Sequence, residues 1–166
     1  MPIPSRWGEF LASYGEAGLR SIDFPGAVSA GPLPSDALVP AGVVSWHEAT
    51  SDAVGCVLEG SPVTRKPPLD WSEATAFQRA VWEALAMIPV GRVCTYGEIA
   101  RQIGHPAAAR AVGAACGANP IPLLVPCHRV VAAGGRLGGF AGGREWKQRL
   151  LAVEGHKIHH FRRLLW

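Results

Sequence analysis

One cysteine in the chain stands directly beside a histidine, and this pair is the strongest candidate for chemistry. Cys127 and His128 lie within the apolar run from residue 121 to residue 131. A thiolate is the reactive form of cysteine, and a neighbouring base can generate it. Because adjacent residues on a strand point to opposite faces, we expect a water molecule to relay the proton between the two side chains. The pattern predicts a nucleophilic thiol at Cys127 with His128 as its base.

A base that activates a nucleophile needs an acid to orient it. The C-terminal half of the chain offers Glu98, Glu145 and Glu154 for this role. No cysteines have C-x-x-C spacing and no Cys/His cluster has the spacing of zinc ligands, so we predict no metal site. A metal site in the histidine-rich tail, at His156, His159 and His160, is a minor alternative because no other ligands have matching spacing. We interpret the remaining cysteines as packing residues: Cys56, Cys94 and Cys116.

Charge is distributed unevenly along the 166 residues. Residues 1–88 carry 5 Lys/Arg and 10 Asp/Glu, whereas residues 89–166 carry 11 Lys/Arg and 3 Asp/Glu. A basic half indicates a polyanionic partner such as nucleic acid, although a solvated basic surface is an equally simple explanation. No apolar run reaches the length of a membrane span and no export signal is visible, so we expect free thiols in a reducing cytoplasm. We also expect the protein to act as a monomer.

The elements that would position these residues predict an α+β fold. Alternating runs at residues 9–14 and 19–24 indicate a β-hairpin. Capping boxes that begin at Ser45, Thr75 and Thr95 predict the starts of three helices. We expect a small N-terminal α/β domain of an antiparallel hairpin or sheet plus a helix, followed by a mainly helical C-terminal domain. The expected bounds, on either side of a proline-rich linker, are 1–66 and 73–166.

Two short helices in the second domain predict a helix-turn-helix. The first spans about residues 96–103, and the second starts after Pro106 and spans about 107–116. The second helix consists almost entirely of Ala and Gly, with Arg110 as its one long side chain. Such a helix cannot read base edges in a major groove, but its smooth face suits close approach to a shallow minor groove. A tightly packed core helix is the competing interpretation.

Several motifs between residues 75 and 155 together resemble those of the O6-alkylguanine-DNA alkyltransferases, also called methylated-DNA–protein-cysteine methyltransferases. The most specific are Pro-Cys-His-Arg-Val at 126–130, Asn-Pro at 119–120 and Arg-Ala-Val-Gly at 110–113. Residues 1–66 match only loosely. The resemblance implies DNA repair by direct reversal, in which an O6-alkylated guanine is flipped from duplex DNA and loses its alkyl group irreversibly to the protein. Activity on O4-alkylthymine stays open.

The resemblance also implies catalytic roles. Cys127 would accept the alkyl group once, without cofactor or turnover. Glu154 would orient His128, which would draw the thiol proton through a bound water. Tyr96 would donate a proton to N3 of the departing guanine. Asn119 would hold the turn between the recognition helix and the active-site strand.

DNA-binding residues follow from the same resemblance. Arg110 would enter the base stack from the minor groove and fill the space left by the flipped base. The other residues expected at the DNA are Thr95, Tyr96, Ala109, Gly113, Ala114 and Arg129.

The substrate pocket would use the backbone carbonyls of Cys127 and Val130 to recognise the guanine amino group, with Phe140 and Pro122 as walls. Phe140 stands where the family often has Tyr, and Ala141 stands where it often has Ser. Cys116 stands where some members carry Met. These changes make the pocket less polar and leave the alkyl preference open.

Three other functions compete with alkyl transfer. A non-catalytic lesion sensor of similar sequence would lack the acceptor cysteine, which is present here as Cys127. A Cys-His hydrolase would need an oxyanion hole, for which the sequence gives no sign. A helix-turn-helix regulator would need a sequence-reading helix, and the alanine-rich segment is not one.

Overall fold

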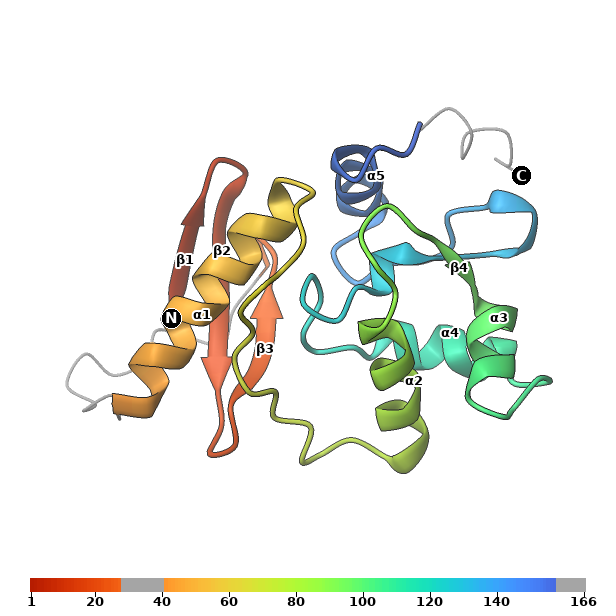
Figure 1. Cartoon of the computed structure of the whole chain (residues 1–166), viewed down its shortest axis with the longest axis horizontal. Coiled ribbons are helices and arrows are strands. Elements are labelled where there is room, and N and C mark those ends of the chain that lie inside the picture. The colour runs from red at the N-terminus through yellow and green to blue at the C-terminus, as the bar shows by residue number, and fades with distance from the viewer. Residues whose placement is uncertain (28–40, 158–166) are drawn as a thin grey trace.

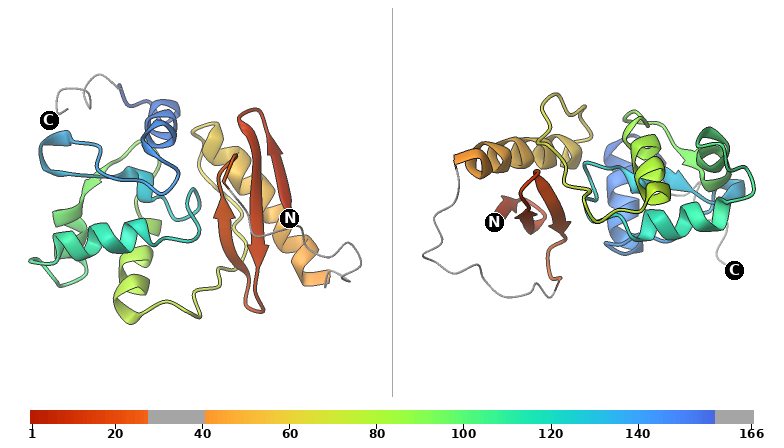
Figure 2. Two further views of the ribbon diagram at one scale, coloured as in Figure 1. Left: turned by 180° about the vertical axis from the view of Figure 1, so that it is seen from behind. Right: turned by 90° about the horizontal axis from the view of Figure 1, so that it is seen from below.

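The N-terminal part of the chain is a three-stranded antiparallel sheet with a helix on one face (Figure 1). The computed structural model describes residues 1–27 and 41–157. The strands lie in the order of the sequence, and the elements are β1 (Pro2–Ser5), β2 (Gly8–Tyr14), β3 (Leu19–Asp23) and α1 (Ala41–Leu58). Figure 2 shows α1 lying over the sheet. The predicted hairpin is therefore present, between β2 and β3.

Two features of this part differ from the sequence-based prediction. The edge strand β1 was not expected, because Pro2 and Pro4 flank its buried Ile3; an edge strand tolerates proline. The helix α1 begins at Ala41, so the start predicted at Ser45 is wrong. The Ser45 hydroxyl donates a hydrogen bond to the Gly42 carbonyl at 3.0 Å inside the helix and does not cap it.

The C-terminal part combines short helices with a small second sheet. Both remaining capping boxes are confirmed, at Thr75 before the second helix and at Thr95 before the third. The elements are α2 (Ala76–Ala86), β4 (Cys94–Thr95), α3 (Tyr96–Gln102), α4 (Ala109–Gly117), the 3-10 turns η1 (Cys127–Arg129) and η2 (Ala133–Gly135), β5 (Val130–Val131) and α5 (Arg144–Val153). The fold class is α+β, as predicted.

The helix pair α3–α4 forms the predicted helix-turn-helix, with one correction. Helix α4 begins at Ala109, two residues later than expected, because residues 106 and 107 form a turn before it. Its N-cap, Ala108, has no side chain that can cap the helix. The buried indole of Trp82 in α2 donates to the Ala115 carbonyl at 2.8 Å and so fixes α4 against α2.

The second sheet brings distant segments together at the centre of this part. Strands β4 and β5 pair in parallel, with Cys94 opposite Val130 and Thr95 opposite Val131. This pairing places Tyr96, at the start of α3, beside the segment that carries Cys127.

The segment that joins the two parts runs along the N-terminal sheet. Leu19 of β3 donates to the Pro68 carbonyl at 2.8 Å, and Asp70 donates back to the Leu19 carbonyl at 2.8 Å. One buried apolar cluster includes residues from both parts. The domain bounds 1–66 and 73–166 stay a prediction. Among the described helices, none has the length and apolar character needed to cross a membrane.

Candidate active site

The segment that carries Cys127 is a tight turn, and the strand expected there begins only at Val130. The Cys127 N–H donates to the Val125 carbonyl at 2.8 Å, and the Arg129 N–H donates to the Pro126 carbonyl at 2.9 Å. The Val130 N–H donates to the Cys127 carbonyl and closes the 3-10 turn. Proline has no N–H to give to a strand ladder, which favours a turn at this point. The prediction of a strand through Cys127 and His128 is therefore wrong.

Asn119 ties this turn to the end of α4. Its side-chain nitrogen donates to the Val125 carbonyl at 2.8 Å and to Cys127 Sγ at 3.2 Å. Its side-chain oxygen accepts from the Ile121 N–H at 3.1 Å. Both Asn119 and Cys127 are buried, so these bonds are shielded from water. The structure thus places Asn119 where it can hold the loop and also touch the thiol.

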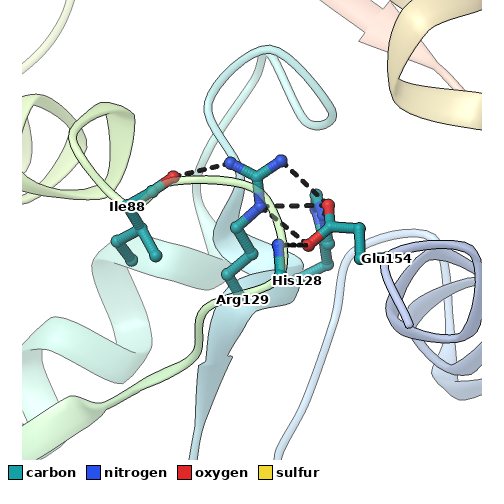
Figure 3. Close-up of polar contacts among 5 residues, drawn as sticks. Ile88, His128, Arg129 and Glu154 are labelled. Atoms are coloured by element: carbon teal, nitrogen blue, oxygen red, sulfur yellow. Dashed lines mark hydrogen bonds and ion pairs between the residues drawn. The ribbon is translucent and has the colours of Figure 1, made fainter. Parts of the chain in front are cut away.

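A buried carboxylate orients the histidine beside the thiol. Glu154 Oε1 lies 2.9 Å from His128 Nε2, and the two side chains are 1% and 0% exposed (Figure 3). Arg129 donates to the same carboxylate through Nε at 3.0 and 3.1 Å and through Nη2 at 2.8 Å. Arg129 Nη1 also donates to the Ile88 carbonyl at 2.6 Å. Of the three glutamates considered from the sequence, Glu154 is the one that the fold brings to His128.

The position of Arg129 corrects its predicted role at the DNA. Its side chain is 8% exposed and points inward, where Glu154 and Ile88 engage its guanidinium. A guanidinium used in this way is not available to a phosphate outside. We therefore reassign Arg129 from DNA contact to orientation of Glu154.

Burial and charge set the protonation states of this cluster. Burial raises the pKa of Cys127, and the Asn119 hydrogen bond and the Lys147 charge partly oppose that rise. Burial lowers the pKa of His128 despite its bond with Glu154, so the imidazole is neutral at pH 7. Burial acts to raise the pKa of Glu154, but bonds with His128 and Arg129 outweigh it and lower the pKa to about 2. The site combines a protonated thiol, a neutral base and an ionised acid.

One ring nitrogen of His128 is not used by Glu154 and could accept the thiol proton. Its Nδ1 atom is buried and has no hydrogen-bond partner among the described residues. Because Nε2 bonds with the Glu154 carboxylate, it carries the proton, and Nδ1 is then the acceptor. A neutral imidazole in this tautomer can accept a proton at Nδ1.

A cavity of about 650 Å³ opens beside this cluster, within the usual size of small-molecule sites. It lies between the helix-turn-helix and the loop after η2. Its lining residues are Tyr96, Ala109, Arg110, Gly113, Gly117, Gly138, Gly139, Phe140 and Ala141. The predicted pocket residues Phe140 and Ala141 are thus in its wall.

Other predicted pocket residues lie behind this wall. Pro122, Val130 and Cys116 are buried and do not line the cavity. Cys127 is 3% exposed and does not line it either. Tyr96 joins the two regions, because it lines the cavity and lies close enough to Cys127 and Cys116 for their charges to affect its pKa. Burial, with these two thiols, raises the pKa of Tyr96 to about 12, so its hydroxyl stays protonated.

Four of the residues predicted to meet DNA line the cavity: Tyr96, Ala109, Arg110 and Gly113. Arg110 and Ala114 are exposed on α4, and Ala109 and Gly113 are partly exposed. The Thr95 hydroxyl is occupied locally, because it accepts the Glu98 N–H at 3.2 Å in the capping box.

Sequence reasoning missed one charged residue, Lys147, which is completely buried in α5. Its ammonium donates to the Val130 carbonyl at 2.6 Å and to the Gly139 carbonyl at 3.2 Å. Burial lowers the pKa of Lys147 to about 8, although the neighbouring Cys127 and Cys116 act to raise it. The available signal was helical spacing, since Lys147 shares the face of the buried Leu150 and Leu151.

No group of three or more His, Cys, Asp or Glu side chains that could hold a metal gathers within 1–27 and 41–157. Of the tail histidines considered for such a site, His159 and His160 lie outside these ranges.

Comparisons with known proteins agree on one family. Residues 76–156 match the sequence model described as 6-O-methylguanine DNA methyltransferase, DNA binding domain. A methylated-DNA–protein-cysteine methyltransferase of Salmonella typhimurium is 58% identical over 84 residues, which are 51% of this chain and 49% of the relative. The chain therefore spans about half the length of the curated relatives it matches.

Solved structures extend the likeness to nearly the whole chain. A Mycobacterium tuberculosis OGT, crystallised in complex with DNA, is 37% identical with a TM-score of 0.75. A structure of the O6-methylguanine methyltransferase of the same organism is 35% identical with a TM-score of 0.69. In both comparisons the likeness covers 92% of this chain and 90% of the other.

Proposed function

The chain belongs to the O6-methylguanine DNA methyltransferase family, and from this membership we propose that it repairs DNA by moving an alkyl group from O6 of guanine to Cys127. The observation that carries the proposal is the buried contact between Glu154 and His128. His128 lies in the same turn as Cys127. This is the set of nucleophile, base and orienting acid that thiol activation requires.

The first chemical step is removal of the thiol proton. Since the pKa of His128 is lowered, its imidazole is neutral and can accept this proton through a water molecule. The ionised Glu154 then stabilises the imidazolium that forms, because the two groups carry opposite charges at 2.9 Å. Asn119, which donates to Sγ, stabilises the thiolate.

The second step is transfer of the alkyl group. Cys127 Sγ attacks the alkyl carbon, a C–S bond forms, and the bond from that carbon to O6 breaks. The electron pair of the broken bond stays on the guanine, which takes a proton at N3 from the Tyr96 hydroxyl. The thioether is not reversed, so each protein molecule acts once, without a cofactor.

DNA binds on the side of the cavity that α4 forms, opposite the His128 side. The smooth face of α4 approaches the minor groove of duplex DNA, and Arg110 enters the stack in place of the extruded base. Extrusion costs a few kcal/mol, and a side chain that fills the gap offsets part of that cost. The protein acts as a monomer in the cytoplasm, bound to nucleoid DNA.

The guanine must reach a thiol that is 3% exposed. We propose that the cavity beside Tyr96 and Phe140 receives the flipped base, and that the Tyr96 side of its wall moves as the base enters. Ala141 offers no hydroxyl to O6, so the contact that holds the base falls to backbone groups.

A transfer assay with duplex DNA that carries labelled O6-methylguanine tests the proposal. We expect Cys127→Ser to abolish transfer and to keep DNA binding. The matched control is Cys94→Ser, which makes the same Cys-to-Ser change at a different thiol, on β4. We expect this variant to transfer the methyl group normally. Removal of the methyl group by Cys127→Ser would show that the mechanism is wrong. DNA binding by the wild type without transfer would favour the lesion-sensor function instead.

A further inference from the structure

The loop that carries Phe140 is enclosed on two sides by aromatic rings. A Cβ atom at Gly138 would lie 2.6 Å from the Tyr96 hydroxyl oxygen, so the backbone touches Tyr96 there. A Cβ atom at Gly142 would lie 2.7 Å from ring carbons of Phe24, which follows β3 of the N-terminal sheet. A side chain at either glycine would require the facing ring to move. The loop is therefore held between a residue of the cavity and a residue of the N-terminal sheet.

Phe24 also packs directly on Phe140. The two ring centroids lie 5.5 Å apart with the planes at 75°, an edge-to-face pair. On its other side Phe140 meets His128 at 6.3 Å and 83°. The ring of Phe140 thus lies between the imidazole of His128 and the ring of Phe24, which follows the last strand of the N-terminal sheet.

Phe24 is itself fixed from behind. Its centroid lies 5.0 Å from that of Trp146 in α5 and 5.5 Å from that of Phe10 in β2. Phe10 is completely buried, so this end of the aromatic cluster cannot yield into solvent. Phe140 is consequently backed by Phe24, which is itself supported by two further rings.

The strand before Phe24 supports the opposite wall of the site as well. The Ile22 N–H donates to the Pro120 carbonyl at 2.9 Å, and Pro120 follows Asn119, which holds Cys127 Sγ. The N-terminal sheet therefore touches both the thiol side and the Phe140 side of the site.

We propose that Phe24 is a specificity-determining residue, which limits the size of the alkyl group by blocking the withdrawal of Phe140 from the cavity. The inference rests on the proposed alkyl transfer. Phe24 acts through Phe140 and touches no substrate, so it is a positioning residue. A smaller side chain at this position leaves a space into which Phe140 can move. The cavity then accepts a bulky alkyl group more readily, while a methyl group gains nothing from the extra room.

The test compares transfer rates from duplex DNA with O6-benzylguanine and with O6-methylguanine. We expect Phe24→Ala and Phe24→Leu to raise the benzyl-to-methyl rate ratio about two- to tenfold, the range that loss of one aromatic pair allows. Phe24→Tyr keeps the ring and should keep the wild-type ratio. Phe24→Leu retains apolar volume and covers the case in which Phe24→Ala does not fold.

The matched control is Trp7→Leu, which removes a ring that packs on Trp146 at 5.7 Å, on the side of the same cluster away from Phe140. We expect it to lower the melting temperature without changing the rate ratio. An unchanged ratio in both Phe24→Ala and Phe24→Leu, or an equal change in Trp7→Leu, would overturn the inference. Failure of the wild type to transfer either group would instead overturn the proposed function.

Discussion

The two sides of the cavity are built in opposite ways. On the inner side, the side chains of His128, Arg129 and Glu154 are 0 to 8% exposed and bond to one another. On the outer side, Arg110 is exposed and makes no hydrogen bond or ion pair with any residue that the structure describes. The proposed chemical groups are therefore oriented by bonds within the protein, whereas Arg110, which we propose to contact DNA, is not. This contrast predicts that inner variants change the rate of chemistry and outer variants change the handling of DNA.

The largest expected effect comes from Glu154→Gln on the inner side. An amide carries no charge to stabilise the His128 imidazolium, and it gives Arg129 a weaker partner. We expect the single-turnover transfer rate to fall about 10²- to 10⁴-fold, the usual range for a lost acid–base function. Glu145→Gln, at the exposed start of α5, is the matched control and should keep the wild-type rate. A transfer rate within a few fold of wild type for Glu154→Gln would contradict the role of Glu154 in stabilising the His128 imidazolium.

Lys147→Met tests whether the buried ammonium supports the thiol. The Lys147 charge lowers the pKa of Cys127, so its removal raises that pKa and reduces the thiolate at neutral pH. We expect alkylation of Cys127 by iodoacetamide at pH 7 to slow about tenfold, since a nearby charge shifts a pKa by about one unit or more. The Val130 and Gly139 carbonyls lose a donor in this variant, so its melting temperature is measured alongside its reactivity.

The matched control for that change is Lys157→Met, at an exposed lysine outside the site. If the Cys127 thiol reacts equally fast in Lys147→Met and in wild type across the pH range, Lys147 does not support the thiolate. Its role is then only to bond to the Val130 and Gly139 carbonyls.

Arg110→Ala tests the outer side. Loss of the side chain that replaces the flipped base should slow transfer from well-stacked duplex DNA about tenfold, because base extrusion costs a few kcal/mol. Transfer from the free base O6-benzylguanine should be unchanged, since no stack is opened. Arg92→Ala, an exposed arginine away from the cavity, is the control. An equal loss of transfer rate with duplex DNA and with the free base would show that Arg110 affects the chemical step and not base extrusion.

Acid unfolding leaves the rate of transfer aside and tests the inner side through stability alone. The pKa of Glu154 is lowered to about 2 in the folded protein from an ordinary 4.5. A lowered carboxyl pKa stabilises the fold above pH 4.5, and this stabilisation is lost as the pH falls toward 2. Its full size is at most about 3 kcal/mol. Urea unfolding across this range should show a steeper loss in wild type than in Glu154→Gln, and parallel curves would contradict the assignment.

The sequence predicted those features that depend on neighbouring residues. The capping boxes at Thr75 and Thr95 were correct because the bonds join residues three apart. The Pro-Cys-His-Arg-Val motif located the turn of the site, although its apolar character suggested a strand. Ser45 fits the same capping pattern, yet the helix extends to Ala41 and its hydroxyl bonds back to Gly42.

Distant contacts outside the family motifs could not be predicted. Nothing local to Arg129 shows that its guanidinium turns inward to Glu154 and Ile88. Lys147 was missed because a charged residue on a buried helix face contradicts the usual hydrophobic pattern. The contact between Phe24 and Phe140 joins residues more than a hundred positions apart, and only the fold reveals it.

Peptide mass spectrometry tests the central claim most directly. The protein is incubated with duplex DNA that contains O6-methylguanine, digested, and compared with a sample incubated with unmodified DNA. We predict one added methyl group on the peptide that contains Cys127, in stoichiometric yield, and none on the peptides of Cys56, Cys94 or Cys116 when the fragments are resolved. A methyl group found on another residue, or restored guanine without any methylated peptide, would contradict transfer to Cys127.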